Sequence, residues 1–186
     1  SLYRLEQAKN ASLLLNIQSP KTIEDVRDFT IKYEQVSFWD SYVPINNTFK
    51  ELLSSGNLTL IKNDSIKNSL LQLDKLYSAI SIYENHIRRD YEQLFYEVAF
   101  KNTSFGNFFD LNDPKNGFNK RLEIKDIPES SRGKLIADAK WIYNNQTMNN
   151  GLKLAVGNNI LLTEIHGNVA KQINKLIKLI DEDIEK

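Results

Sequence analysis

A long run of apolar side chains in the middle of the chain recurs at steps of three and four residues. The run follows the helix-capping residues Asn63, Asp64 and Ser65, and Glu84 alone interrupts it. Its members are Ile66, Leu70, Leu73, Tyr77, Ile80, Ile87, Tyr91, Leu94 and Val98. This spacing places the apolar side chains on one face of a helix, and such a face requires partner helices to cover it. The pattern therefore predicts a long helix over residues 66–98 within a bundle.

A second long helix is predicted over residues 152–184. Its apolar positions have the same spacing: Leu162, Ile165, Val169, Ile173, Leu176, Ile180 and Ile184. Gly157 and Gly167 lie inside it, and each lowers helix stability by roughly 1 kcal/mol relative to alanine. We therefore expect a kink or a close approach of another helix near one of these glycines.

Shorter helices are expected near the N-terminus, over residues 3–17 and 23–36, with Ser19 and Pro20 between them. Thr22 and Asp25 have the spacing of a capping box at the start of the second of these helices. Its buried stripe is expected to comprise Val26, Phe29, Tyr33 and Val36.

The next segment combines a short helix with a connector. The helix is expected over residues 45–53 and should stop at Gly56, because glycine readily adopts the left-handed conformation that terminates helices. Residues 58–61 are too few and too alternating for a helix. We expect them to be extended and to tuck Leu58 and Leu60 under the bundle.

The helical pattern stops over residues 101–132, which are rich in asparagine, glycine and proline. An irregular stretch of this length is rare in compact domains. It contains four phenylalanines, which indicate that it packs back onto the bundle: Phe105, Phe108, Phe109 and Phe118. A further helix is predicted over residues 131–143.

These segments predict an all-α fold, an elongated helical bundle with two long antiparallel helices and an irregular insertion rich in phenylalanine and asparagine. A chain of 186 residues suffices for one ordinary domain, so we assign residues 1–186 to a single helical domain. The sequence has no run of about 18 apolar residues, and the chain as given is therefore expected to be soluble.

Few residues of this sequence are suited to chemistry. It has no cysteine, which excludes disulfides and cysteine nucleophiles, and its only histidines are His86 and His166. The 24 lysines and arginines balance 24 aspartates and glutamates, so no net charge favours nucleic acid. We expect no catalytic, cofactor-binding or metal-binding residue and no nucleic-acid partner. A carboxylate-based enzyme stays open as an alternative, since paired carboxylates are assembled in space and leave no local motif.

Two local clusters suggest chemistry but have simpler explanations. Glu84 and Arg88 have the i,i+4 spacing of an ion pair on a solvated helix face. Residues 110–114 resemble the start of a calcium loop, but Lys115 stands where the loop needs glycine and Arg121 where it needs glutamate. We expect neither cluster to bind a ligand.

Aromatic side chains raise the question of a partner surface. Those on the first long helix are expected in the core: Tyr77, Tyr83, Tyr91, Phe95 and Tyr96. Trp39 and Tyr42 lie between predicted helices, where a tryptophan either plugs the end of the bundle or meets a partner, and we favour the plug. Any partner surface is expected on the Trp39 loop or on the insertion from Phe105 to Phe118.

Residues 48–70 resemble the signature of a bacterial family, domain of unknown function 6090. Residues 54–56 read Ser-Ser-Gly, residues 58–61 read Leu-Thr-Leu-Ile, and an Asn-Asp pair at 63–64 opens the long helix. The C-terminal residues 176–185 also resemble the end of that family.

The resemblance implies a membrane-anchored protein of the bacterial inner membrane, with a transmembrane helix ahead of a mainly helical extracytoplasmic domain. This sequence contains no such helix, and the family has no established activity to assign to its residues. We expect a non-enzymatic interaction or sensor-like binding domain, with a protein partner or self-association. The alternative is a soluble cytoplasmic helical scaffold.

Overall fold

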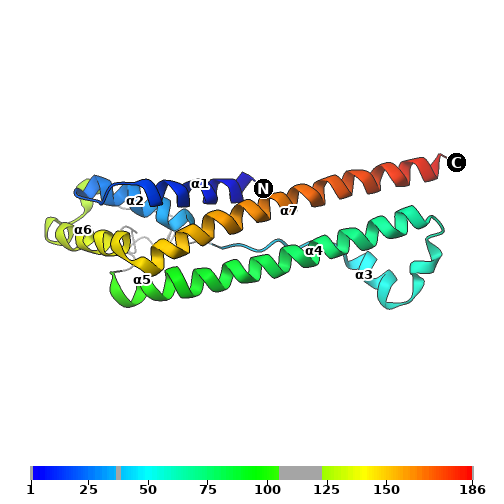
Figure 1. Cartoon of the computed structure of the whole chain (residues 1–186), viewed down its shortest axis with the longest axis horizontal. Coiled ribbons are helices and arrows are strands. Elements are labelled where there is room, and N and C mark those ends of the chain that lie inside the picture. The colour runs from blue at the N-terminus through cyan, green and yellow to red at the C-terminus, as the bar shows by residue number, and fades with distance from the viewer. Residues whose placement is uncertain (1, 37–38, 105–122, 186) are drawn as a thin grey trace.

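The computed structural model describes residues 2–36, 39–104 and 123–185, and within these ranges every regular element is a helix. The chain opens with α1 (Leu2–Asn16) and α2 (Ile23–Val36), which pack together as a hairpin (Figure 1). The backbone N–H of Thr22 donates to Asp25 Oδ2 at 3.0 Å, and the Asp25 N–H donates to Thr22 Oγ1 at 3.2 Å. The predicted helices and the capping box are confirmed.

The two long helices form the antiparallel pair that the apolar spacing predicts (Figure 1). The first begins as α4 (Asp64–Asp90), passes through a π-helical turn, η2 (Tyr91–Tyr96), and ends as α5 (Glu97–Asn102). The second is α7 (Gln146–Ile184). Asn63 caps α4 and also donates from Nδ2 to Asp183 Oδ1 at 2.7 Å, so the start of α4 is joined to the end of α7.

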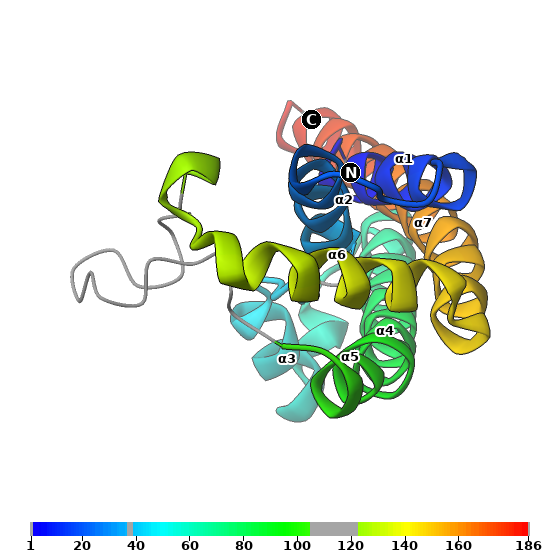
Figure 2. The ribbon, with the colours of Figure 1, turned by 90° about the vertical axis from the view of Figure 1, so that its left-hand side faces the viewer.

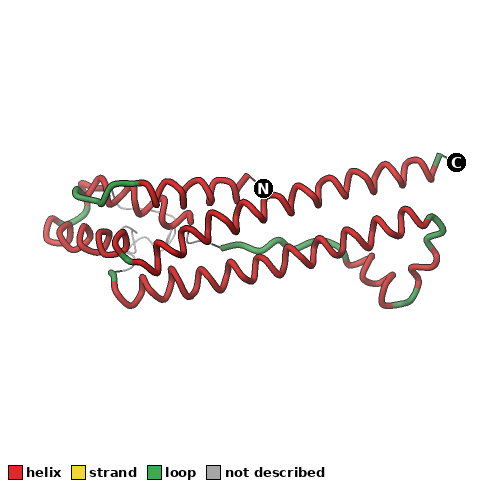
Figure 3. Tube along the Cα trace, in the orientation of Figure 1, coloured by secondary structure: helices red, strands yellow, loops and turns green. Residues whose placement is uncertain are grey.

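The molecule is elongated and has a head and an arm (Figures 1 and 3). The head contains α1, α2, α5, η2, α6 (Glu129–Asn144) and the first part of α7, and Figure 2 shows α6 running across its end. The arm is the first part of α4 packed on the second part of α7. Buried side chains of the arm seam are Ile66, Leu73, Ile80, Leu162, Val169 and Leu176. The all-α, elongated bundle is thus confirmed.

The connector after the third helix differs from the expectation. Here α3 (Asn47–Ser54) ends before Gly56, which has the expected left-handed conformation with a φ of 73°. The next residues form a 3-10 turn, η1 (Asn57–Leu60), and are not extended. The side chain of Leu60 is 65% exposed. The prediction that Leu60 tucks under the bundle is wrong, because this turn lies at the far end of the arm, where few helices offer a surface (Figure 1).

The close approach of helices falls at a different glycine from those expected. A Cβ atom at Gly151 would lie 2.9 Å from Phe95 Cζ, so the ring packs directly on the α7 backbone there. A Cβ at Gly157 or Gly167 would meet nothing within 4 Å. The expectation of a close approach at either of these two residues is therefore wrong.

The structure describes the two ends of the irregular insertion. At one edge, α5 ends at Asn102, and at the other a short 3-10 turn, η4 (Ile124–Asp126), precedes α6. Its four phenylalanines and the calcium-like residues 110–114 lie outside the described residues.

Candidate interaction surface

A buried polar network joins the head to α4. The Arg4 guanidinium donates from Nη2 to Glu84 Oε1 at 3.2 Å, and the two side chains are 6% and 5% exposed. Arg4 also donates to Gln7 Oε1 and to the carbonyl oxygen of Asp40, while Glu84 Oε2 accepts from the backbone N–H of Tyr42. The network therefore fixes α1, α4 and the segment after α2 against one another.

This geometry corrects the interpretation of Glu84 as part of a solvated helix face. Its carboxylate is paired with Arg4, far away in sequence, and Arg88 takes a different contact. The guanidinium carbon of Arg88 lies 5.8 Å from the centroid of the Trp39 ring. Trp39 is half-buried against the side of this long helix, so the expectation that it plugs an end of the bundle is wrong.

The two histidines have separate aromatic neighbours. The His166 ring lies edge-on to Tyr42 with centroids 5.7 Å apart, whereas the His86 ring lies 6.5 Å from Tyr83. Burial lowers the pKa of His166, and the positive charge of Arg4 contributes in the same direction. Among the described residues, no group of three or more histidine and carboxylate side chains is arranged to hold a metal ion.

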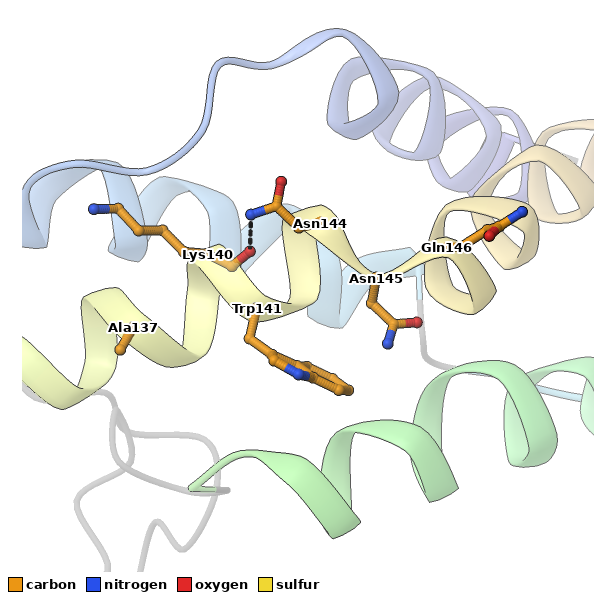
Figure 4. A pocket seen from close by; sticks show the side chains of 6 residues that line it. All are labelled: Ala137, Lys140, Trp141, Asn144, Asn145 and Gln146. Carbon is orange, nitrogen blue, oxygen red and sulfur yellow. Dashed lines mark hydrogen bonds between the residues drawn. The ribbon is translucent and has the colours of Figure 1, made fainter.

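A surface depression of about 530 Å³ lies where α6 meets α7. Figure 4 shows the Trp141 ring projecting into it from α6, while Asn144 turns back to donate to the Lys140 carbonyl oxygen at 2.8 Å. The lining residues are Ala137, Lys140, Trp141, Asn144, Asn145 and Gln146. Lys140 is the only charged side chain among them, so the depression holds no paired acid and base.

A second hollow, of about 420 Å³, separates α3 from α4. Leu70, Leu73 and Tyr77 of α4 line one wall, and residues 45–49 line the other. Asn46 Oδ1 is buried there and has no hydrogen-bond partner in the described part of the chain. No side chain of α3 is fully buried, and its Phe49 and Leu52 are half-buried.

An apolar stripe runs along the second part of α7, in the arm. We define the α7 stripe as Ala170, Ile173, Ile177, Ile180 and Ile184, which follow one another at steps of three and four residues. Ile177 is 52% exposed, Ile180 37% and Ile184 78%. Ile173 is half-buried, because it also contacts the seam with α4. The stripe is therefore an open apolar face beside the buried seam.

The position of α1 explains why this stripe is open. Along the first part of α7, α1 covers the helix, and it begins near the middle of α7 (Figure 1). Arg4, in the first turn of α1, is linked to this region of α7, because its partner Glu84 accepts from the Tyr42 N–H and the Tyr42 ring lies 5.7 Å from the His166 ring. Ala170 follows one helical turn after His166, so the stripe continues along α7 from the point where α1 begins.

The apolar spacing of residues 152–184 did not separate seam from stripe. We expected Ile180 and Ile184 in the buried seam, but the structure places Leu179 against α4 and leaves these two isoleucines exposed. A signal was present, because Ile177 belongs to a second series at the same spacing, offset by one residue from Leu176. Two such series on one helix indicate two apolar faces.

No family model, curated protein or solved structure matches this chain. None of the helices in the described ranges has the combination of length and apolarity that crossing a membrane requires.

Proposed function

We propose that this chain is a non-enzymatic interaction module whose binding surface is the α7 stripe on the arm. The observation that carries the proposal is the exposure of Ile177, Ile180 and Ile184 along one face of a helix. Exposed apolar side chains that gather in a continuous face, unlike scattered ones, are typical of a surface that contacts a partner.

The rest of the structure supports this role. The buried Arg4–Glu84 ion pair attaches α1 of the head to α4, and it therefore helps to hold the arm in position relative to the head. Polar side chains border the stripe on the side away from α4, as in the polar rim of a protein interface: Asn174 and Asp181.

We also propose that a segment outside these 186 residues tethers the module to the bacterial inner membrane, on its extracytoplasmic side. The support is the resemblance of residues 48–70 to the family described above. Fusing alkaline phosphatase to the end of the complete gene product tests the location, since this reporter is active outside the cytoplasm. An inactive fusion of normal abundance would favour the cytoplasmic scaffold.

The binding role is tested by placing a photo-crosslinking amino acid at single positions of the protein in its own cells. Position 177 lies on the stripe, and position 178 lies next to it but points away from it, with a Lys178 side chain that is 78% exposed. We expect crosslinks to protein from position 177 and few from position 178. Equal yields from the two positions, or none from either, would refute the proposal.

A further inference from the structure

We propose that the partner of the α7 stripe is the same stripe of a second copy, packed antiparallel about a two-fold axis. This inference rests on the proposed function, because it identifies the partner of the surface described there.

The spacing of the stripe is self-complementary. From Ile173 to Ile184 the isoleucines follow at steps of four, three and four residues, which read the same in both directions. When two such helices run antiparallel, Ile173 of one copy lies opposite Ile184 of the other, and Ile177 lies opposite Ile180. These are the alternating layers of an antiparallel coiled coil, and the same patch serves on both copies.

The charges on this part of α7 favour the antiparallel direction. Lysines come first, at positions 171, 175 and 178, and acidic residues follow at 181, 182, 183 and 185. Antiparallel packing keeps the acidic ends of the two helices at opposite ends of the contact. Parallel packing would set the two acidic ends side by side, where like charges repel.

The stripe also continues an interface that already exists within the chain. Along the first part of α7, the helix is covered by α1, which runs antiparallel to it (Figure 1). A second copy of α7 would occupy the corresponding place along the second part, beside α4. The two arms would then form a four-helix bundle, which buries more apolar surface than two separate helix pairs.

The short length of the stripe limits the surface that two copies can bury against each other. Ile173 to Ile184 spans about 17 Å of helix at 1.5 Å per residue. A contact of about three helical turns is small for a protein interface, so we expect a weak and reversible dimer. Tethering two copies to one membrane would raise their effective concentration and favour the dimer further.

The first test is sedimentation equilibrium of the purified chain over a range of micromolar concentrations. We expect a monomer–dimer equilibrium, and we expect Ile177→Asp to raise the dissociation constant by at least about tenfold, since it places a carboxylate in the contact. Ile82→Asp is the matched control, because Ile82 is 58% exposed on α4 and outside the stripe. Circular dichroism verifies that both variants remain folded. A chain that stays monomeric, or an equilibrium that Ile177→Asp leaves unchanged, overturns the inference.

The second test determines the direction of packing. Because the sequence contains no cysteine, introduced cysteines report single positions. A mixture of Ile173→Cys and Ile184→Cys chains should form a disulfide between the two variants, and neither variant should crosslink with itself. Self-crosslinking of each variant would show parallel packing and overturn the inference.

These outcomes separate the dimer from the proposed function. If the purified chain is monomeric but position 177 crosslinks to a different protein in cells, the interaction role stands and the self-association is refuted. If neither self-association nor any crosslink from position 177 occurs, both are refuted.

Discussion

Arg4 and Glu84, which are 80 residues apart in sequence, form an ion pair with side chains only 6% and 5% exposed. The pair joins the first turn of α1 to the C-terminal part of α4. Because the Glu84 carboxylate also accepts from the Tyr42 N–H, one buried charge pair holds three separate parts of the chain together.

Removing one charge of this pair should markedly lower the stability of the folded protein. We expect Glu84→Gln to lower the free energy of unfolding by about 3 kcal/mol, because it leaves the Arg4 guanidinium buried without a counter-ion. Urea denaturation measures this value. Glu97→Gln is the control, since Glu97 pairs with Lys101 while 60% exposed, and it should cost less than about 1 kcal/mol. Similar losses in the two variants would contradict the role assigned to the buried pair.

The arm seam should be sensitive to charge. Leu73 is 8% exposed and lies between α4 and α7, so Leu73→Asp should lower the free energy of unfolding by about 4 kcal/mol. We expect Ile82→Asp, on an exposed position of the same helix, to change it by no more than about 0.5 kcal/mol. Thermal unfolding followed by circular dichroism compares the two. An unchanged melting temperature for Leu73→Asp would show that this face of α4 is not buried.

The glycines of α7 should respond in opposite directions to alanine. Gly151→Ala places a methyl group 2.9 Å from the buried Phe95 ring, and we expect a loss of about 1–3 kcal/mol from overpacking. Gly157→Ala meets no atom within 4 Å and should instead gain up to about 1 kcal/mol from helix propensity. Denaturant unfolding of both variants tests the prediction, which fails if the two shifts have the same sign.

The stability of the protein should fall as His166 becomes protonated. Its pKa is lowered by burial and by the Arg4 charge from the ordinary value of 6.5, so the unfolded chain binds the proton more readily than the folded one. The stabilisation is therefore complete above pH 6.5 and is lost as the pH falls through the folded-state pKa. We expect His166→Asn to reduce the loss of stability in this acidic range, with His86→Asn as the matched variant. An NMR titration in which His166 has a pKa at or above 6.5 would contradict this expectation.

The sequence by itself determined the helices and several of their ends. The three-and-four spacing from Ile66 through Leu70, Leu73 and Tyr77 to Ile80 is a local property of a helix, and so is the capping contact of Thr22 with Asp25. Gly56 likewise ends its helix region through its own backbone conformation. Each of these signals depends on residues within one or two turns, so each could be recognised without knowing what packs where.

The buried polar network and the α7 stripe depend on long-range contacts, which the spacing of apolar residues along the sequence does not reveal. Arg4, Gln7 and Asn10 of α1 are buried although they are polar, because their partners come from α2, α4 and the segment after α2. The same long-range packing decided that Gly151 and not Gly157 approaches a neighbour, and that Ile180 is exposed while Leu179 is covered. Local periodicity specifies which residues share a helix face. Only the tertiary structure decides whether another element covers that face. On α7, coverage depends on where α1 begins alongside it, and that position is fixed by contacts throughout the bundle.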